Sequence, residues 1–255
     1  MTNERYKILK LTEHKEWLAE SPVKIEKGQL LFDNQSNKTI LQIKLFNLSD
    51  KIIKAVFLDV DCFDAANDFL SSLNDVVIQG VEAKPHSNFG DRQPIILEYS
   101  NTSNVKITIG KVVFVDDNVW RNEEKNPGTV LPDQKIIDQN DPLYGQVIRE
   151  CSEKNIMPVY WFESMDDYWR CTCGQPNKLD LLRCGYCQTE KEWLRQCFDK
   201  QYLTEANARF MESEEIRIIE DKKRQEELGN QAKAKKKKQK IVTLITALVC
   251  LIISS

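Results

Sequence analysis

Apolar and polar residues alternate along much of the first half of the chain. In TILQIKLFN, Leu41, Ile43 and Leu45 alternate with Gln42 and Lys44. In AVFLDVDCF the apolar positions on one side are Val56, Leu58, Val60 and Cys62. A period of two places one face of a strand on a core and the other toward water.

Further strand-like runs follow, namely VVIQGVE, PIILEYS, NVKITIG and KVVFVDD. Turn-forming stretches such as DNQSNK, NLSDK and NTSN separate the runs. About seven short strands in about a hundred residues are typical of a two-sheet protein. We therefore predict a leader over residues 1–22 and an immunoglobulin-like antiparallel β-sandwich over residues 23–120. Cys62 and Trp120 are expected in its core.

The pattern changes after Trp120. Residues 121–165 are punctuated by Pro and Gly and predict a linker with a short helix from Tyr144 to Lys154. The aromatic run Tyr160, Trp161 and Phe162 is expected to pack a small cysteine-rich module, residues 166–189, against its neighbours. From residue 190 to 228 apolar residues recur at helical spacing and predict one long amphipathic helix. The fold class is thus multi-domain, mainly β and then α.

The end of the chain combines a basic run with an apolar one. Residues 229–240 include KAKKKKQK, and residues 241–255 carry no charge. Fifteen helical residues reach about 22 Å, short of the roughly 30 Å hydrocarbon core. We nevertheless predict a transmembrane segment over 241–255, either cut short or ending with Ser254 and Ser255 in the interface.

Lysines next to such a segment indicate the cytoplasmic side. The predicted location is therefore the cell membrane, with one crossing and residues 1–240 in the cytoplasm. A nucleic-acid patch or a localisation signal is the alternative reading of the lysines.

Charge is distributed unevenly. Residues 222–240 hold nine Lys or Arg and two Glu, so the first 221 residues carry −10 of a total charge of −3. Affinity for phosphate is mainly electrostatic, so the acidic body argues against nucleic-acid binding.

Four of the eight cysteines gather in WRCTCGQPNKLDLLRCGYC. Cys171, Cys173, Cys184 and Cys187 form two close pairs, as four thiolates around one tetrahedral zinc ion require. The polar N-terminus has no apolar secretory core, which favours reduced thiols and metal over disulfides. With four ligands the shell is closed and the ion is structural. A redox pair or an iron–sulfur cluster is the alternative.

Trp169, Asn177 and the four cysteines read W-x-C-x-C-x3-N-x6-C-x2-C, which resembles the Ran-binding-protein type of zinc finger. The resemblance implies that Trp169 and Asn177 brace the knuckles and that the module binds ubiquitin or single-stranded RNA. The first knuckle departs from the family by holding one residue between its cysteines. Gly174 and Gln175 replace the Thr-Phe pair of ubiquitin binders, and KLDLLR has few of the Arg and Asn residues of RNA binders.

A wider resemblance covers the order of modules. A β-domain with NFGDRQPIIL, then YWRCTCGQPN and CGYC, a long helix, a lysine run and an apolar end are similar to membrane-anchored zinc-ribbon proteins of low-GC Gram-positive bacteria. The resemblance implies an architecture and a compartment, and no activity.

Candidate catalytic groups are sparse. The two histidines, His14 and His86, fall in the leader and in a turn, and no phosphate-binding loop is present. Asp59, Asp61 and Asp64 are better explained as a solvated strand face than as a carboxylate cluster.

We therefore predict a non-catalytic, membrane-anchored zinc adaptor that binds a protein partner at the cytoplasmic face. Leu181, Leu182 and Tyr186 are the candidate partner contacts. The alternative is single-stranded nucleic-acid binding through the finger. A homodimer through the long helix is also open.

Overall fold

The structure, a computed structural model, describes residues 5–12, 14 and 16–253, with side chains described as far as residue 236. The structure is mainly β, with most of its strands first and its long helix last, which agrees with the predicted order of β and then α structure, although one short helix precedes the last three short strands. The elements group into two compact units. The first comprises Met1–Asp138 with Cys151–Gln196, and the second comprises Gln139–Glu150 with Cys197–Ser255.

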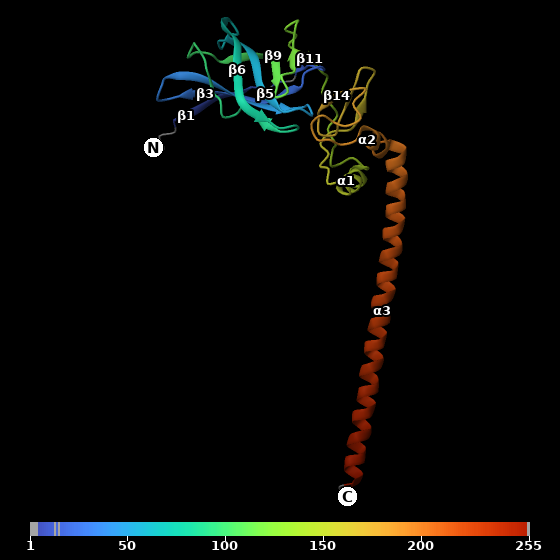
Figure 1. Cartoon of the computed structure of the whole chain (residues 1–255). Coiled ribbons are helices and arrows are strands. Elements are labelled where there is room, and N and C mark those ends of the chain that lie inside the picture. Colours follow the sequence, from blue (N-terminus) through green and yellow to red (C-terminus); the bar gives the residue numbers. More distant parts are fainter. Residues whose placement is uncertain (1–4, 13, 15, 254–255) are drawn as a thin grey trace. The chain divides into compact units, whose positions relative to one another are not determined.

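The first unit contains two large antiparallel sheets (Figure 1). One has the order β1-β3-β4-β7, with β8 also paired to β4. Its strands are β1 (Tyr6–Thr12), β3 (Val23–Asp33), β4 (Lys38–Asn47), β7 (Asn88–Phe89) and β8 (Ile95–Ile96). The other has the order β10-β9-β5-β6. Its strands are β5 (Ile53–Phe63), β6 (Phe69–Ala83), β9 (Asn104–Phe114) and β10 (Val119–Arg121).

One hydrophobic core draws on both sheets, because the predicted alternation holds at its centre. Leu41 and Leu45 of β4 are fully buried, as are Leu58 and Cys62 of β5. Trp120 packs against the same core while staying half-buried. The polar positions between them, such as Asp59, lie on the outer side at intermediate exposure. Period-two patterning therefore specifies which face of each strand is buried.

The assignment of residues 1–22 to a leader differs from the structure. β1 lies within this range and pairs with β3, with Tyr6 opposite Asp33. Arg5 adds an ion pair to the Asp33 carboxylate at 3.1 Å. Most β1 side chains are exposed, so no buried stripe marks this edge strand in the sequence.

Two small sheets complete the first unit. β2 (Glu16–Trp17) pairs with β11 (Thr129–Val130), which lies in the predicted linker. β12 (Glu163–Ser164), β13 (Tyr168–Arg170) and β14 (Pro176–Lys178) form a three-stranded sheet in the order β12-β13-β14. We call residues 166–189, which contain this sheet's hairpin and the four cysteines, the ribbon.

The helices are α1 (Tyr144–Ser152), α2 (Lys191–Cys197) and α3 (Lys200–Ile253). The single helix expected over residues 190–228 is therefore two helices. Asp199 lies between them, and its carboxylate accepts a hydrogen bond from the Tyr202 backbone N–H at 2.9 Å, as an N-cap does. The Asp199 side chain therefore caps the start of α3.

In the second unit α1 contacts the first turns of α3. The Arg149 guanidinium donates to Asn207 Oδ1 at 2.8 Å and lies 3.7 Å from the ring centre of Phe210. The Tyr202 hydroxyl donates to Glu150 at 3.1 Å. From end to end α3 is one uninterrupted helix of 54 residues (Figure 1), about 80 Å long at 1.5 Å per residue.

The predicted transmembrane segment, residues 241–255, lies outside the residues whose side chains the structure describes. Within the described part of the chain, no helix combines the length and apolar character needed to cross a membrane.

Candidate metal centre

Two turns bring the four cysteines together. Cys171 and Cys173 lie in the turn of the β13–β14 hairpin, and Cys184 and Cys187 lie in the loop that leads to α2. All four sulfur atoms are within 4.8 Å of one another. Cys171 Sγ is 3.4 Å from Cys187 Sγ, and Cys173 Sγ is 3.7 Å from Cys184 Sγ. The sequence-predicted ligands therefore form one cluster that is able to hold a metal ion.

The spacing of the sulfur atoms matches a tetrahedral centre. Four ligands at the usual zinc–sulfur distance of about 2.3 Å place their sulfur atoms about 3.8 Å apart. Two of the sulfur–sulfur distances, 3.4 and 3.7 Å, are close to this value, and no pair is more than 4.8 Å apart. Cys171 and Cys184 are fully buried, whereas Cys187 lies at the surface. The arrangement thus suits one ion at the edge of the ribbon.

Gly174 is required by the first turn. Its φ is +91°, and a Cβ at this position would lie 2.9 Å from Cε2 of Tyr160. Its N–H donates to the Cys171 carbonyl at 2.9 Å and closes the turn. A residue with a side chain would be strained here and would collide with the Tyr160 ring. In the second turn the left-handed conformation is adopted by Gln188, with φ of 62°, and not by Gly185.

Asn177 connects the two turns, as the resemblance implied. Its Oδ1 accepts a hydrogen bond from the Gly185 N–H at 2.9 Å, and its Nδ2 lies 3.7 Å from Cys184 Sγ. Nδ2 also donates to the Gln175 carbonyl at 2.8 Å. The side chain is buried, at 3% exposure, so these bonds are made away from competing water.

Trp169 forms the small apolar centre of the ribbon. It is fully buried, and its Nε1–H donates to the Leu181 carbonyl at 3.1 Å. Phe162 lies against it with ring centres 6.1 Å apart. The indole therefore fixes the segment between the cysteine pairs from inside.

Sequence reasoning missed two supports of the cysteines. Thr189 places its hydroxyl 3.1 Å from Cys187 Sγ. Gln134, far away in the sequence, donates through Nε2 to the carbonyls of Trp161 and Cys171 at 2.7 and 3.1 Å. The threonine two residues after the second pair was a local signal for such a contact. Gln134 had no local signal, because its role depends on the path of residues 121–165.

The thiols are strongly coupled to one another. Hydrogen bonding to Cys171 raises the pKa of Cys173 well above its ordinary value. Hydrogen bonds from Cys171 and Cys173 lower the pKa of Cys187. Crowded thiols share protons because neighbouring thiolates repel one another. A divalent cation removes that repulsion, so metal binding displaces protons and should weaken as the pH falls.

The three predicted partner contacts divide into two groups. Leu181 and Leu182 are exposed, at 43% and 80%. Tyr186 is instead half-buried against the first sheet, with its ring centre 4.5 Å from that of Phe46 and its hydroxyl donating to Glu26 at 3.2 Å. Its assignment as an exposed contact is therefore not supported. Phe46 and Glu26 are far from Tyr186 in the sequence, so no local pattern predicted this contact.

His86 is a second link between the ribbon and the sheets. Its Nδ1 lies 3.1 Å from the Gly185 carbonyl oxygen, and its Nε2 lies 3.0 Å from Asp50 Oδ1. The sequence placed His86 in a turn without a role. Its position instead attaches the second cysteine turn to the loop before β7.

The aspartates of LDVDCFD are engaged locally. Asp59 pairs with Lys125 at 2.8 Å and accepts from the Asp75 N–H at 3.0 Å. Asp64 accepts from the backbone N–H groups of Ala66 and Asp68 at 2.8 and 2.9 Å. These contacts agree with a solvated strand face followed by a turn.

No protein family model, curated protein or solved structure matches this chain.

Proposed function

We propose that this protein is a non-catalytic zinc-binding adaptor, anchored to a membrane, whose ribbon presents an apolar loop to a protein partner on the cytoplasmic side. The observation that carries the proposal is the juxtaposition, in one small module, of a four-cysteine cluster and two exposed leucines. The ion would hold the loop in shape, and the loop would make the contact.

Zinc is the metal that best suits the cluster. Four thiolates at tetrahedral spacing fill the coordination shell of Zn²⁺, so no position is left for water or a substrate. The buried Asn177 and Trp169 side chains brace the cysteines as in a structural site. Side chains that bond to the ligand-bearing turns in this way hold metal ligands in their orientation. One structural Zn²⁺ per chain is therefore the expected cofactor.

The surface of the ribbon favours a protein partner over single-stranded nucleic acid. Nucleic-acid modules stack bases on exposed aromatic rings and attract phosphate with free basic residues. Trp169 is fully buried, so its ring is not available for stacking. Lys178 pairs with Glu20, and Arg183 pairs with Glu190. An exposed apolar loop is instead typical of a protein contact.

The other modules take supporting roles in this proposal. The two antiparallel sheets with their common core would form the immunoglobulin-like sandwich, and α3 would act as a spacer. The lysine run over 229–240 and the uncharged residues 241–255 support the membrane anchor, with residues 1–240 in the cytoplasm. Pairing of two copies through α3 stays a prediction.

A photo-crosslinking experiment tests the partner surface. A photoreactive phenylalanine analogue replaces Leu182 in the full chain, in membranes of cells that express it. The control position is Leu228, an equally apolar residue of α3 that is 55% exposed. We expect one defined protein adduct from position 182, lost when Cys184→Ser removes the metal. Equal adducts from both positions, or an adduct that survives metal loss, would contradict the proposal.

A further inference from the structure

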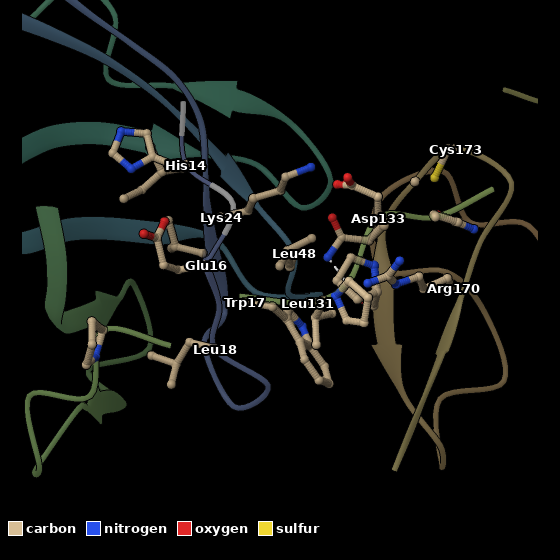
Figure 2. A pocket seen from close by; sticks show the side chains of 18 of the residues that line it. His14, Glu16, Trp17, Leu18, Lys24, Leu48, Leu131, Asp133, Arg170 and Cys173 are labelled. Carbon is tan, nitrogen blue, oxygen red and sulfur yellow. Dashed lines mark hydrogen bonds between the residues drawn. The ribbon is translucent and has the colours of Figure 1, made fainter. Parts of the chain in front are cut away.

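A cavity of about 570 Å³ lies within the first unit, between the start of the first sheet, residues 126–136 and the ribbon. Figure 2 shows labelled side chains from all three parts around it, among them Trp17, Lys24, Leu131, Asp133 and Arg170. Its volume is in the range of small-ligand sites, about 300–1,000 Å³. The cavity is separate from the loop of Leu181 and Leu182.

Arg170 brings a buried positive charge to the cavity. Its side chain is 6% exposed, and its ion pair with Glu163 is long, at 3.7 Å. A guanidinium has five N–H donors, whereas the ion pair with Glu163 involves one of its nitrogens, and the centre of the Tyr168 ring lies 5.6 Å away. This side chain lines the cavity. A ligand anion there would complete its hydrogen bonding.

Two residues that line the same cavity carry unpaired acceptors. Gln175 is 3% exposed, and its Oε1 has no hydrogen-bond partner among the described residues. The same holds for Oε1 of Gln134. Both residues line the cavity and form hydrogen bonds with the backbone of Cys171. The Cys171 N–H donates to the Gln175 carbonyl, and Gln134 Nε2 donates to the Cys171 carbonyl. The guanidinium of Arg170 and these two unpaired oxygens therefore belong to side chains that line the same cavity.

The remaining walls are apolar or of mixed charge. Trp17, Leu131 and the isoleucines of β3 and β9 supply apolar surface. Lys24 and Asp133 point toward one another in Figure 2. A ligand that is apolar in one part and charged in another matches this lining.

We propose that the cavity binds an α-carboxylate ligand with an adjacent N–H group and an apolar side chain. The carboxylate would pair with Arg170, since guanidinium and carboxylate form paired hydrogen bonds. The N–H would donate to Oε1 of Gln175 or Gln134, and the side chain would lie against Trp17 and Leu131. A free apolar amino acid and the C-terminal residue of a peptide share this chemistry.

Calorimetric titration of the full chain, zinc-loaded and in detergent micelles, tests the ligand chemistry with three probes. N-acetyl-L-leucine carries the carboxylate and the N–H, N-acetyl-L-leucinamide lacks the carboxylate, and L-leucine carries a free ammonium. We expect N-acetyl-L-leucine to bind at least about 10-fold more tightly than the amide. Binding of L-leucine as well would identify free amino acids as the source, and its absence would identify peptide ends. If N-acetyl-L-leucine does not bind, or if the amide binds equally, the proposal is overturned.

Substitutions then place the ligand in this cavity. Arg170→Met should weaken N-acetyl-L-leucine about 10-fold or more, while the matched change Arg92→Met on the surface should leave the affinity unchanged. Gln175→Leu removes an unpaired oxygen and is expected to keep the fold while weakening the same probe. Zinc content reports whether each variant retains its ribbon. Unchanged affinity in both cavity variants would overturn the proposal without affecting the partner surface.

Discussion

The two large sheets and the ribbon are stabilised in different ways. The sheets bury long rows of aliphatic side chains, such as Leu41 and Leu58, in one core. In the ribbon, Trp169 is a single large apolar buried side chain among cysteines and polar groups. Burial of each large aliphatic side chain contributes about 1.5–3 kcal/mol, so the sheets have a sufficient core. A module of the ribbon's size is too small to have a sufficient core of its own. Its stability depends on metal binding and on its contacts with the sheets.

This difference decides what a cysteine does in each region. Cys62 is a fully buried member of the sheet core, where it acts as a small apolar residue. Cys184 is equally buried but lies among three other thiols. Substitutions that separate packing from metal binding therefore test the comparison directly.

The largest effect is expected from Cys184→Ser. A three-thiolate remnant does not close the tetrahedron, so zinc should fall from one per chain to near zero and the ribbon should unfold locally. Structural zinc sites supply about 10–16 kcal/mol of apparent binding free energy. Elemental analysis measures the metal, and amide NMR spectra report the ribbon.

Cys62→Ala is the matched control. It should lower the stability of the sheets and leave zinc at one per chain. Equal metal loss in both variants would mean that the two regions do not differ as described.

Trp169→Ala should have the next largest effect. Loss of a buried Trp typically costs about 3–5 kcal/mol, here also with loss of the hydrogen bond to the Leu181 carbonyl. We expect zinc to exchange faster with a competing chelator. The double change of Leu181 and Leu182 to Ser, on the outside of the same loop, should leave zinc exchange unchanged. The opposite pattern would show that the inside and outside of the ribbon are wrongly assigned.

Leu58→Ala should act on the sheets. Leu58 is fully buried in their core, and such substitutions cost about 2–5 kcal/mol. Urea unfolding monitored by circular dichroism should shift to lower denaturant. Zinc content should stay at one per chain in native buffer, and a loss of metal there would contradict separate stabilisation.

Tyr186→Phe should give the smallest effect. It removes the hydrogen bond to Glu26 and keeps the ring contact with Phe46, so we expect a loss of about 1 kcal/mol. Urea unfolding measures it, with Tyr99→Phe, a tyrosine that is 42% exposed, as the control. An equal shift in both variants would argue that Tyr186 does not attach the ribbon to the sheets.

The sequence was informative wherever a pattern is local. Alternation identified the buried face of β4 and β5, because burial on one side of a strand repeats every second residue. The cysteine spacing identified the cluster, since both pairs are formed by short turns. Asp199 was also a local signal, as an Asp before a helical stretch is a common N-cap, and it was overlooked.

Features that depend on distant pairing were not predictable in the same way. β1 is an exposed edge strand without a buried stripe of its own. It is a strand because it pairs with β3. Tyr186 bonds to Glu26, and His86 lies next to the Gly185 carbonyl oxygen, so each contact joins residues about a hundred or more positions apart in the sequence. The cavity lies where three segments that are far apart in the sequence come together, and no short motif predicts such an arrangement.

X-ray absorption at the zinc edge of the full, metal-loaded chain tests the central claim most directly. A closed structural site predicts four sulfur neighbours at about 2.3 Å and no lighter neighbour. The spectrum should not change when N-acetyl-L-leucine is added. An oxygen or nitrogen atom bonded to the zinc would mean an open coordination position, and would contradict the claim that the metal is purely structural.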